Sequence, residues 1–183
     1  MTGSDNSVLE TKFTQPGATL SDGTVIRGYA SVFGVRDRGG DIVMPGAYSA
    51  SLKRLHEQGG RVRMLWQHDQ GQPIGVWDEI EEDQHGLRVS GRLLSDVAKG
   101  REAAALMAAG AVDGLSIGYR TVRAEKLPNG GRKLIELELW EVSLVTFPML
   151  RAARVTTKST PEDTGLMASF TDALNAAASA LRE

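Results

Sequence analysis

The sequence contains no cysteine among its 183 residues. Disulfide bonds, thiolate catalysis and cysteine metal sites are therefore excluded, and the composition is consistent with a reducing cytoplasm. Histidine is also scarce, with three residues, and none of them has the spacing of a zinc motif such as H-E-x-x-H. We therefore expect no zinc site.

Long hydrophobic runs and an excess of charge of one sign are missing too. No stretch approaches the roughly 18 apolar residues of a membrane-spanning helix, and the first residues lack the basic and apolar regions of a signal peptide. The formal net charge is −2, which provides no strongly basic field for neutralising nucleic-acid phosphates. We expect a soluble protein that is not exported and binds neither membranes nor nucleic acid.

The composition is that of a globular protein, with 41% hydrophobic and 24% charged residues. The length fits one domain with a single core. After Val155 the sequence becomes polar, TTKSTPEDT, and then places apolar residues at helical spacing. We predict one domain over residues 1–155, followed over residues 156–183 by a polar linker and an amphipathic helix.

Strands dominate the predicted secondary structure. Alternating apolar residues or β-branched and aromatic residues predict strands over 25–33, 61–68, 74–82, 86–94, 115–125, 132–140 and 142–147. Helices are predicted over 47–58, ending at Gly59, and over the alanine-rich residues 96–110. This order favours an α+β fold in which a mainly antiparallel or mixed β-barrel is surrounded by a few helices.

Residues 114–118, GLSIG, have the pattern G-x-S-x-G around Ser116. In α/β-hydrolases this pattern joins a strand to a helix, and a histidine follows later in the chain. Here a helix precedes the pattern and the last histidine is His85, so that kind of site is excluded. Small residues beside Ser116 still suit close approach by a substrate backbone. From this segment alone, a serine on the polar face of a strand is the simpler interpretation.

His68 is a candidate general base at the end of the predicted strand 61–68. It continues the apolar face of that strand and precedes the turn DQGQP, so its imidazole would be half buried and aimed outward from the core. A core histidine bound to a backbone carbonyl fits the sequence as well. His56, on a charged helix, and His85, in a hairpin turn, are interpreted as surface residues.

Glu141 interrupts an apolar pattern in residues 132–147. Strand alternation places an apolar face on one side, formed by Ile135, Leu137 and Leu139, and puts Glu136 and Glu138 on the other. Glu141 falls on this apolar face, called the leucine face below. A buried carboxylate is costly unless it is paired, and a histidine is its most economical partner. A bulge or strand end near Trp140 that brings Glu141 to water is an equally good interpretation.

His68, Ser116 and Glu141 together are the residue types of a base, a nucleophile and a group that orients the base. Their chain order differs from the orders in chymotrypsin, subtilisin and the α/β-hydrolases. Geometry rather than order defines such a site, so the three residues remain candidates for nucleophilic catalysis.

Four segments of the chain resemble the prohead (capsid-maturation) serine proteases of tailed bacteriophages. They are GYASVFGVRDRGGDIVMPGAY near the start, MLWQHDQGQPIG around His68, GLSIGY around Ser116 and LELWEVSLVTFPML around Glu141. The resemblance runs from about Thr24 to Val155, nearly the whole predicted globular part.

The resemblance implies a fold and a set of site residues. The phage family is related in fold to the herpesvirus maturational protease, a β-barrel surrounded by helices. It implies that His68 is the base, Ser116 the nucleophile and Glu141 the third residue, with Asp69 and the glutamates at 136 and 138 as alternatives for the third position. Herpesvirus enzymes also use arginines near the oxyanion, and either Arg151 or Arg154 could correspond.

The resemblance also implies a function that needs no metal or cofactor. The expected activity is that of a serine endopeptidase that cleaves scaffold, or the scaffold-like N-terminal region of the capsid protein, and itself. It would act inside the assembling procapsid in the host cytoplasm, and the source would be a phage, a prophage or a gene transfer agent. Because herpesvirus relatives work as dimers, a homo-oligomer is a further expectation. The alternative is a catalytically inactive capsid-assembly or scaffold-binding protein with the same fold.

Overall fold

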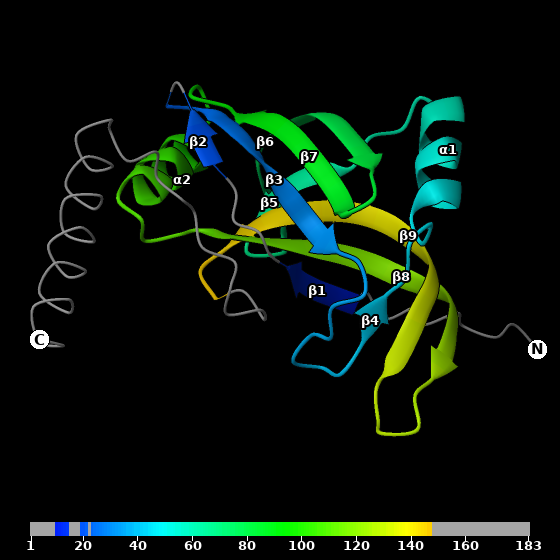
Figure 1. Cartoon of the computed structure of the whole chain (residues 1–183). Coiled ribbons are helices and arrows are strands. Elements are labelled where there is room, and N and C mark those ends of the chain that lie inside the picture. Colours follow the sequence, from blue (N-terminus) through cyan, green and yellow to red (C-terminus); the bar gives the residue numbers. More distant parts are fainter. Residues whose placement is uncertain (1–9, 15–18, 22, 148–183) are drawn as a thin grey trace, which may run out of the picture.

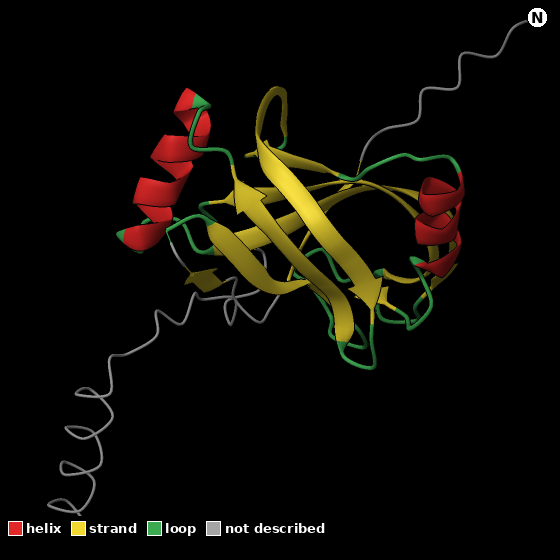
Figure 2. Ribbon diagram, turned by 90° about the horizontal axis from the view of Figure 1, so that it is seen from above, coloured by secondary structure: helices red, strands yellow, loops and turns green. Residues whose placement is uncertain are grey.

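The computed structural model describes residues 10–14, 19–21 and 23–147. In chain order its elements are β1 (Glu10–Thr14), β2 (Thr19–Ser21), β3 (Val25–Val32), β4 (Ile42–Val43), α1 (Ser49–Glu57), β5 (Arg63–Trp66), β6 (Asp69–Glu82), β7 (Gly86–Leu93), α2 (Ala98–Ala108), β8 (Gly114–Lys126) and β9 (Arg132–Val145). Figure 1 shows α1 and α2 at opposite ends of the sheet, and the view from above in Figure 2 agrees. The predicted boundary at residue 155, the linker and the last helix lie outside the described residues.

The described strands form one curled sheet. Its order is β1-β8-β9-β5-β6-β7-β3-β2, with β4 beside β9. The pairs are antiparallel except that β4 and β5 run parallel to β9. Among the described strands the order ends at β1 and at β2, and β3 contacts both β1 and β8. The α+β class and the mainly antiparallel arrangement are confirmed, while the expected barrel is a half-barrel.

The inner face of the half-barrel holds the hydrophobic core. From β8, Leu115, Ile117 and Tyr119 enter this core and are at most 2% exposed. Burying each such side chain contributes about 1.5–3 kcal/mol to folding. Because side chains alternate along a strand, Ser116 and Gly118 face the other side of the sheet. The core thus fixes the direction in which Ser116 points.

Helix α1 packs against β9 and is capped by a carboxylate from β6. The backbone N–H of Tyr48 donates to Glu82 Oε1 at 3.0 Å, and the Ser49 hydroxyl donates to Glu82 Oε2. A carboxylate at a helix N-terminus satisfies unpaired N–H groups and complements the helix dipole. At the other end Gly59 has a left-handed φ of 62°, as predicted for the residue that ends this helix.

Strand β9 is a single bulged strand where the sequence predicts two. Its register against β8 passes from Leu139 to Glu141 and leaves Trp140 unpaired. The bulge reverses the alternation, so that Leu139 and Val142 both join the core. The expectation that Glu141 shares the leucine face is therefore wrong. The predicted bulge is present, yet Glu141 does not reach water, since it is 3% exposed.

Candidate active site

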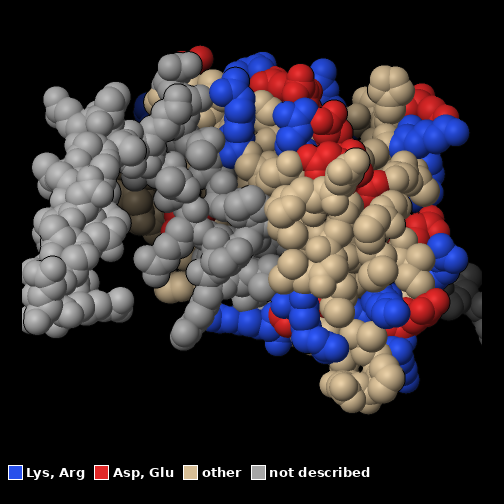
Figure 3. Space-filling model, in the orientation of Figure 1, with Lys and Arg blue, Asp and Glu red and all other residues tan. Residues whose placement is uncertain are grey.

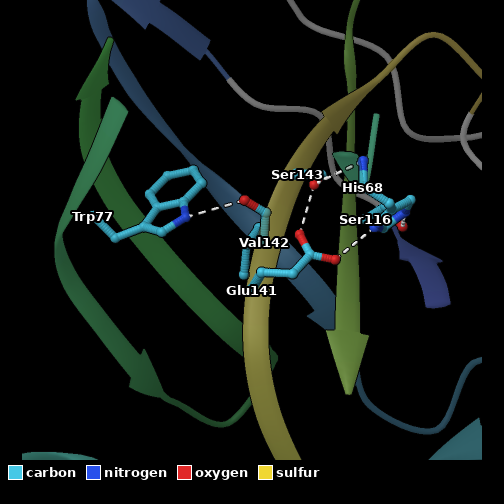
Figure 4. A network of polar contacts seen from close by, with 6 residues as sticks. All are labelled: His68, Trp77, Ser116, Glu141, Val142 and Ser143. Atoms are coloured by element: carbon cyan, nitrogen blue, oxygen red, sulfur yellow. Dashed lines mark hydrogen bonds and ion pairs between the residues drawn. The ribbon is translucent and has the colours of Figure 1, made fainter. Parts of the chain in front are cut away.

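The structure brings His68, Ser116 and Glu141 together on the outer side of the sheet. Ser116 Oγ lies 2.6 Å from His68 Nε2, and His68 Nδ1 lies 2.5 Å from Glu141 Oε1. Figure 4 shows the imidazole between the serine on β8 and the carboxylate on β9. Both distances are within the range of hydrogen bonds. The three side chains form one hydrogen-bonded chain from a hydroxyl to a carboxylate.

The pairing of β8 with β9 places the acid. Gly118 is paired with Glu141, and a Cβ atom on Gly118 would lie only 2.1 Å from Glu141 Oε1. Any larger residue at this position would push the carboxylate away from the histidine. The second glycine of the G-x-S-x-G pattern therefore makes room for the acid. The sequence had suggested room for a substrate backbone instead.

A two-residue turn places His68. Strand β5 ends at Trp66, which pairs with Asp69, so the predicted strand through residue 68 is too long. Between them Gln67 has φ 52° and His68 has φ 63°. Positive φ at both central residues is typical of a type I′ turn, which favours Asn-Gly. A residue with a Cβ atom pays about 1–2 kcal/mol in this conformation.

Contacts with β9 hold this turn in place. The backbone N–H of Gln67 donates to the carbonyl of Leu144 at 2.9 Å, and its side-chain amide donates to Thr146 Oγ1 at 2.6 Å. The backbone N–H of His68 donates to Ser143 Oγ at 3.2 Å. These bonds offset the backbone strain, and they exist because β5 runs parallel to β9.

Both carboxylate oxygens of Glu141 have a hydrogen-bond partner. Its Oε2 accepts a hydrogen bond from the Ser143 hydroxyl at 2.6 Å, while Oε1 faces His68. A carboxylate can only accept, so Nδ1 carries the imidazole proton and Nε2 accepts from the Ser116 hydroxyl. The His68 side chain is 18% exposed, which leaves it within reach of a substrate. This arrangement can deprotonate Ser116 as it attacks a carbonyl group.

Comparison with known proteins identifies the family. The sequence matches the caudovirus prohead serine protease family over residues 10–166. The chain belongs to this family. The prohead protease of Enterobacteria phage HK97 is 34% identical over 142 residues, which are 76% of this chain and 60% of that protein. The chain therefore spans less than two thirds of the length of this relative.

One further sequence relative and one solved structure are also similar to this chain. A capsid polyprotein of Pseudomonas phage PAJU2 is 33% identical over 102 residues, which are 52% of this chain and 15% of the polyprotein. The structure of the bacteriophage T4 capsid assembly protease superimposes with a TM-score of 0.63 at 14% identity, covering 76% of this chain and 98% of that one. At this identity the likeness shows the fold.

A cavity opens beside the acid on the same side of the sheet. Its volume is about 230 Å³, and its walls are Arg63, Leu65, Gln70, Trp140 and Glu141. Trp140 is 46% exposed because the bulge turns it outward next to Glu141. An indole and a leucine side chain favour an apolar group over a charged one. In a protease such a cavity can accept a substrate side chain.

The alternatives for the third residue are engaged elsewhere. The carboxylate of Asp69 accepts hydrogen bonds from Gly71 and Gln72 of its own strand, β6. Glu136 lies 3.9 Å from Arg54, and Glu138 forms an ion pair with Arg120 at 2.6 Å. Of the acidic residues singled out in the sequence, the structure places Glu141 against His68.

Some features expected from the sequence can be compared with the described residues and others cannot. Arg151 and Arg154 lie outside the described residues. Within the described ranges, no group of three or more His, Cys, Asp or Glu is arranged to hold a metal ion. None of the described helices has the length and apolarity to cross a membrane.

Two residues that support the site, Ser143 and Gln67, were not predicted from the sequence. For Ser143 the available signal was a polar residue two positions after Glu141.

Proposed function

We propose that the protein is a serine endopeptidase in which Ser116 is the nucleophile, His68 the general base and Glu141 the acid that orients the base. The observation that supports this most directly is the continuous hydrogen-bonded chain, with steps of 2.6 and 2.5 Å, from Ser116 through His68 to Glu141. Membership of a serine protease family supports the same assignment.

The proposed reaction proceeds through an acyl-enzyme. Ser116 Oγ attacks the scissile carbonyl while its proton passes to His68 Nε2, and the resulting imidazolium is stabilised by Glu141. The imidazolium then gives the proton to the leaving amine as the C–N bond breaks. Water, deprotonated by His68, hydrolyses the ester and restores the hydroxyl. Backbone amides, together with Arg151 or Arg154, would stabilise the oxyanion.

The proposed substrates are capsid-related proteins. Proteins similar to this chain are called a prohead protease, a capsid polyprotein and a capsid assembly protease. We infer that the protein cleaves scaffold, or the scaffold-like N-terminal region of the capsid protein, and itself, inside the assembling procapsid in the host cytoplasm. On the face in Figure 3 acidic and basic side chains are interspersed, so substrate recognition there would not depend on charge of one sign.

The test is coexpression with a candidate capsid protein, followed by intact-mass spectrometry of both chains. The proposal predicts a shortened capsid or scaffold protein with the wild type and full-length chains with Ser116→Ala. Ser51→Ala is a matched control, because Ser51 is also buried and its hydroxyl contacts β9 away from the site. Cleavage that continues with folded Ser116→Ala contradicts the proposal. Full-length chains with folded wild type favour an inactive capsid-assembly protein.

A further inference from the structure

Ser143 joins the acid and the base through one hydroxyl group. It lies on β9 two residues after Glu141, is paired with Ser116 on β8 and is fully buried. Its Oγ accepts a hydrogen bond from the backbone N–H of His68 at 3.2 Å and donates one to Glu141 Oε2 at 2.6 Å. Figure 4 shows both contacts meeting at this atom.

The single proton of the hydroxyl determines how the carboxylate is oriented. Because Ser143 donates to Oε2, the oxygen Oε1 is left to face His68 Nδ1. Glu141 is 3% exposed, so bulk water is poorly placed to supply a replacement donor. Without the hydroxyl the carboxylate would lose a charge-assisted hydrogen bond, one of the stronger kinds in proteins.

The acceptor side of the same hydroxyl fixes the base. His68 has φ 63°, a conformation that its side chain disfavours and that needs support from its surroundings. The contact from its N–H to Ser143 ties this residue to the strand that carries the acid. One hydroxyl thus sets the position of the backbone that bears the imidazole and the rotation of the carboxylate that accepts the hydrogen bond of the imidazole.

We propose that Ser143 is a positioning residue of the active site, acting on the reaction through Glu141 and His68. The proposal rests on the proposed function and deepens it. Ser143→Ala should lower kcat/KM by about ten- to a hundredfold, the size expected when a hydrogen bond to a charged group is lost. The loss should fall on kcat, with KM within about twofold, because Ser143 lies behind the reacting atoms and does not hold the substrate.

A double-mutant cycle separates positioning from mere support of the fold. In a Glu141→Ala background there is no carboxylate to orient, so Ser143→Ala should cost no more than about threefold. A serine that only supports the backbone would cost the same factor in both backgrounds. Ser143→Cys keeps a similar size and a weak donor, so its activity should lie between that of serine and alanine and provides the test if alanine misfolds.

Ser51→Ala is the matched control. Its hydroxyl is also buried and accepts a backbone N–H of β9, from Leu139 at 2.9 Å. This variant should lower the melting temperature while kcat/KM stays within about twofold of wild type.

The assay uses the full chain and a peptide spanning the cleavage site mapped by coexpression. A kcat/KM of Ser143→Ala or Ser143→Cys equal to wild type, or equal losses in both backgrounds of the cycle, would overturn the inference. Ser116→Ala distinguishes the two levels of the argument. If folded Ser116→Ala cleaves normally, the proposed function is wrong, and the inference about Ser143 is wrong as well. If Ser116→Ala is inactive and the Ser143 variants are normal, this inference alone fails.

Discussion

Two hairpin turns of the same sheet both contain two consecutive residues with a left-handed backbone, but the residue types differ. The turn between β8 and β9 uses Gly130 at φ 81° and Gly131 at φ 79°. The turn between β5 and β6 uses Gln67 at φ 52° and His68 at φ 63°. Left-handed backbone carries little steric cost in glycine and about 1–2 kcal/mol in a residue with a Cβ atom.

The difference shows where the fold accepts strain. The glycine turn lies at the far end of the long β8–β9 hairpin, where the Gly130 carbonyl accepts a hydrogen bond from Arg36 at 2.9 Å, and it carries none of the proposed catalytic residues. The strained turn carries the proposed base, and hydrogen bonds to Leu144, Ser143 and Thr146 on or next to β9 hold it there. Unfavourable backbone conformations persist where the surroundings over-determine them, and they concentrate at functional sites.

The largest expected effect comes from removing the residue that the strained turn presents, or its partner. His68→Ala and Ser116→Ala should each lower turnover by up to ~10⁶, because the members of such a site act as a unit. The measurement is the rate of peptide cleavage, with a melting curve for each variant. A folded variant with more than a few per cent of wild-type activity would show that the turn does not serve catalysis.

Glu141→Gln should have the next largest effect, a loss of roughly 10²–10⁴ in kcat. Serine and histidine remain, and only the orientation and charge stabilisation of the imidazole are lost. Glu138→Gln is the control on the same strand, since Glu138 pairs with Arg120 instead, and should stay within a few-fold of wild type. If Glu141→Gln cleaves normally, the third residue lies elsewhere, and Asp69 is the next candidate.

A pair of substitutions tests the comparison of the turns directly. Gln67→Gly relieves strain but removes the bonds to Thr146, so kcat/KM should fall about tenfold as the position of His68 loosens, with little change in melting temperature. Gly130→Ala should do the opposite, losing ~1–2 kcal/mol of stability with activity within twofold of wild type. The comparison is wrong if Gly130→Ala is the variant that loses activity.

The smallest expected effect concerns the cavity beside the acid. Trp140→Ala removes most of one apolar wall without touching the hydrogen-bonded chain, so KM should rise a few-fold while kcat stays within about twofold. Peptides with apolar and with charged residues near the cleavage site, assayed on both proteins, measure this. Equal KM values for all peptides would exclude the cavity as a substrate subsite.

The fold was largely predictable because period-two patterns and turn residues are local signals. They predicted β3, β7, β8 and the part of β6 from Ile74 onward, together with the helix that ends before Gly59 and the β8–β9 hairpin at Gly130 and Gly131, whereas residues 69–73, predicted as a turn, belong to β6. The sequence offered a bulge near Trp140 only as one of two equal interpretations, because a run such as LELWEVSLV fits an unbroken strand as well. That single extra residue moved Glu141 to the other face from the one predicted.

The sequence predicted which residues form the candidate site, but not the turn and the hydrogen bonds that hold them in position. Resemblance to a family singled out His68, Ser116 and Glu141, which the structure places within hydrogen-bond reach of one another. The left-handed turn at His68 and the bonds of Ser143 depend on β5 lying parallel to β9, a long-range pairing that no local pattern reveals. The conformation of this turn therefore follows from tertiary packing and not from the local propensities of its residues.

The most direct test of the central claim is to map the residue that a fluorophosphonate modifies, by mass spectrometry of the full chain. The reagent phosphonylates an activated serine by the same attack that opens a peptide bond. The account predicts one adduct per chain, on Ser116, formed at least a hundredfold more slowly in His68→Ala. An adduct on another serine, or cleavage that continues at an unchanged rate once Ser116 is fully modified, would contradict it.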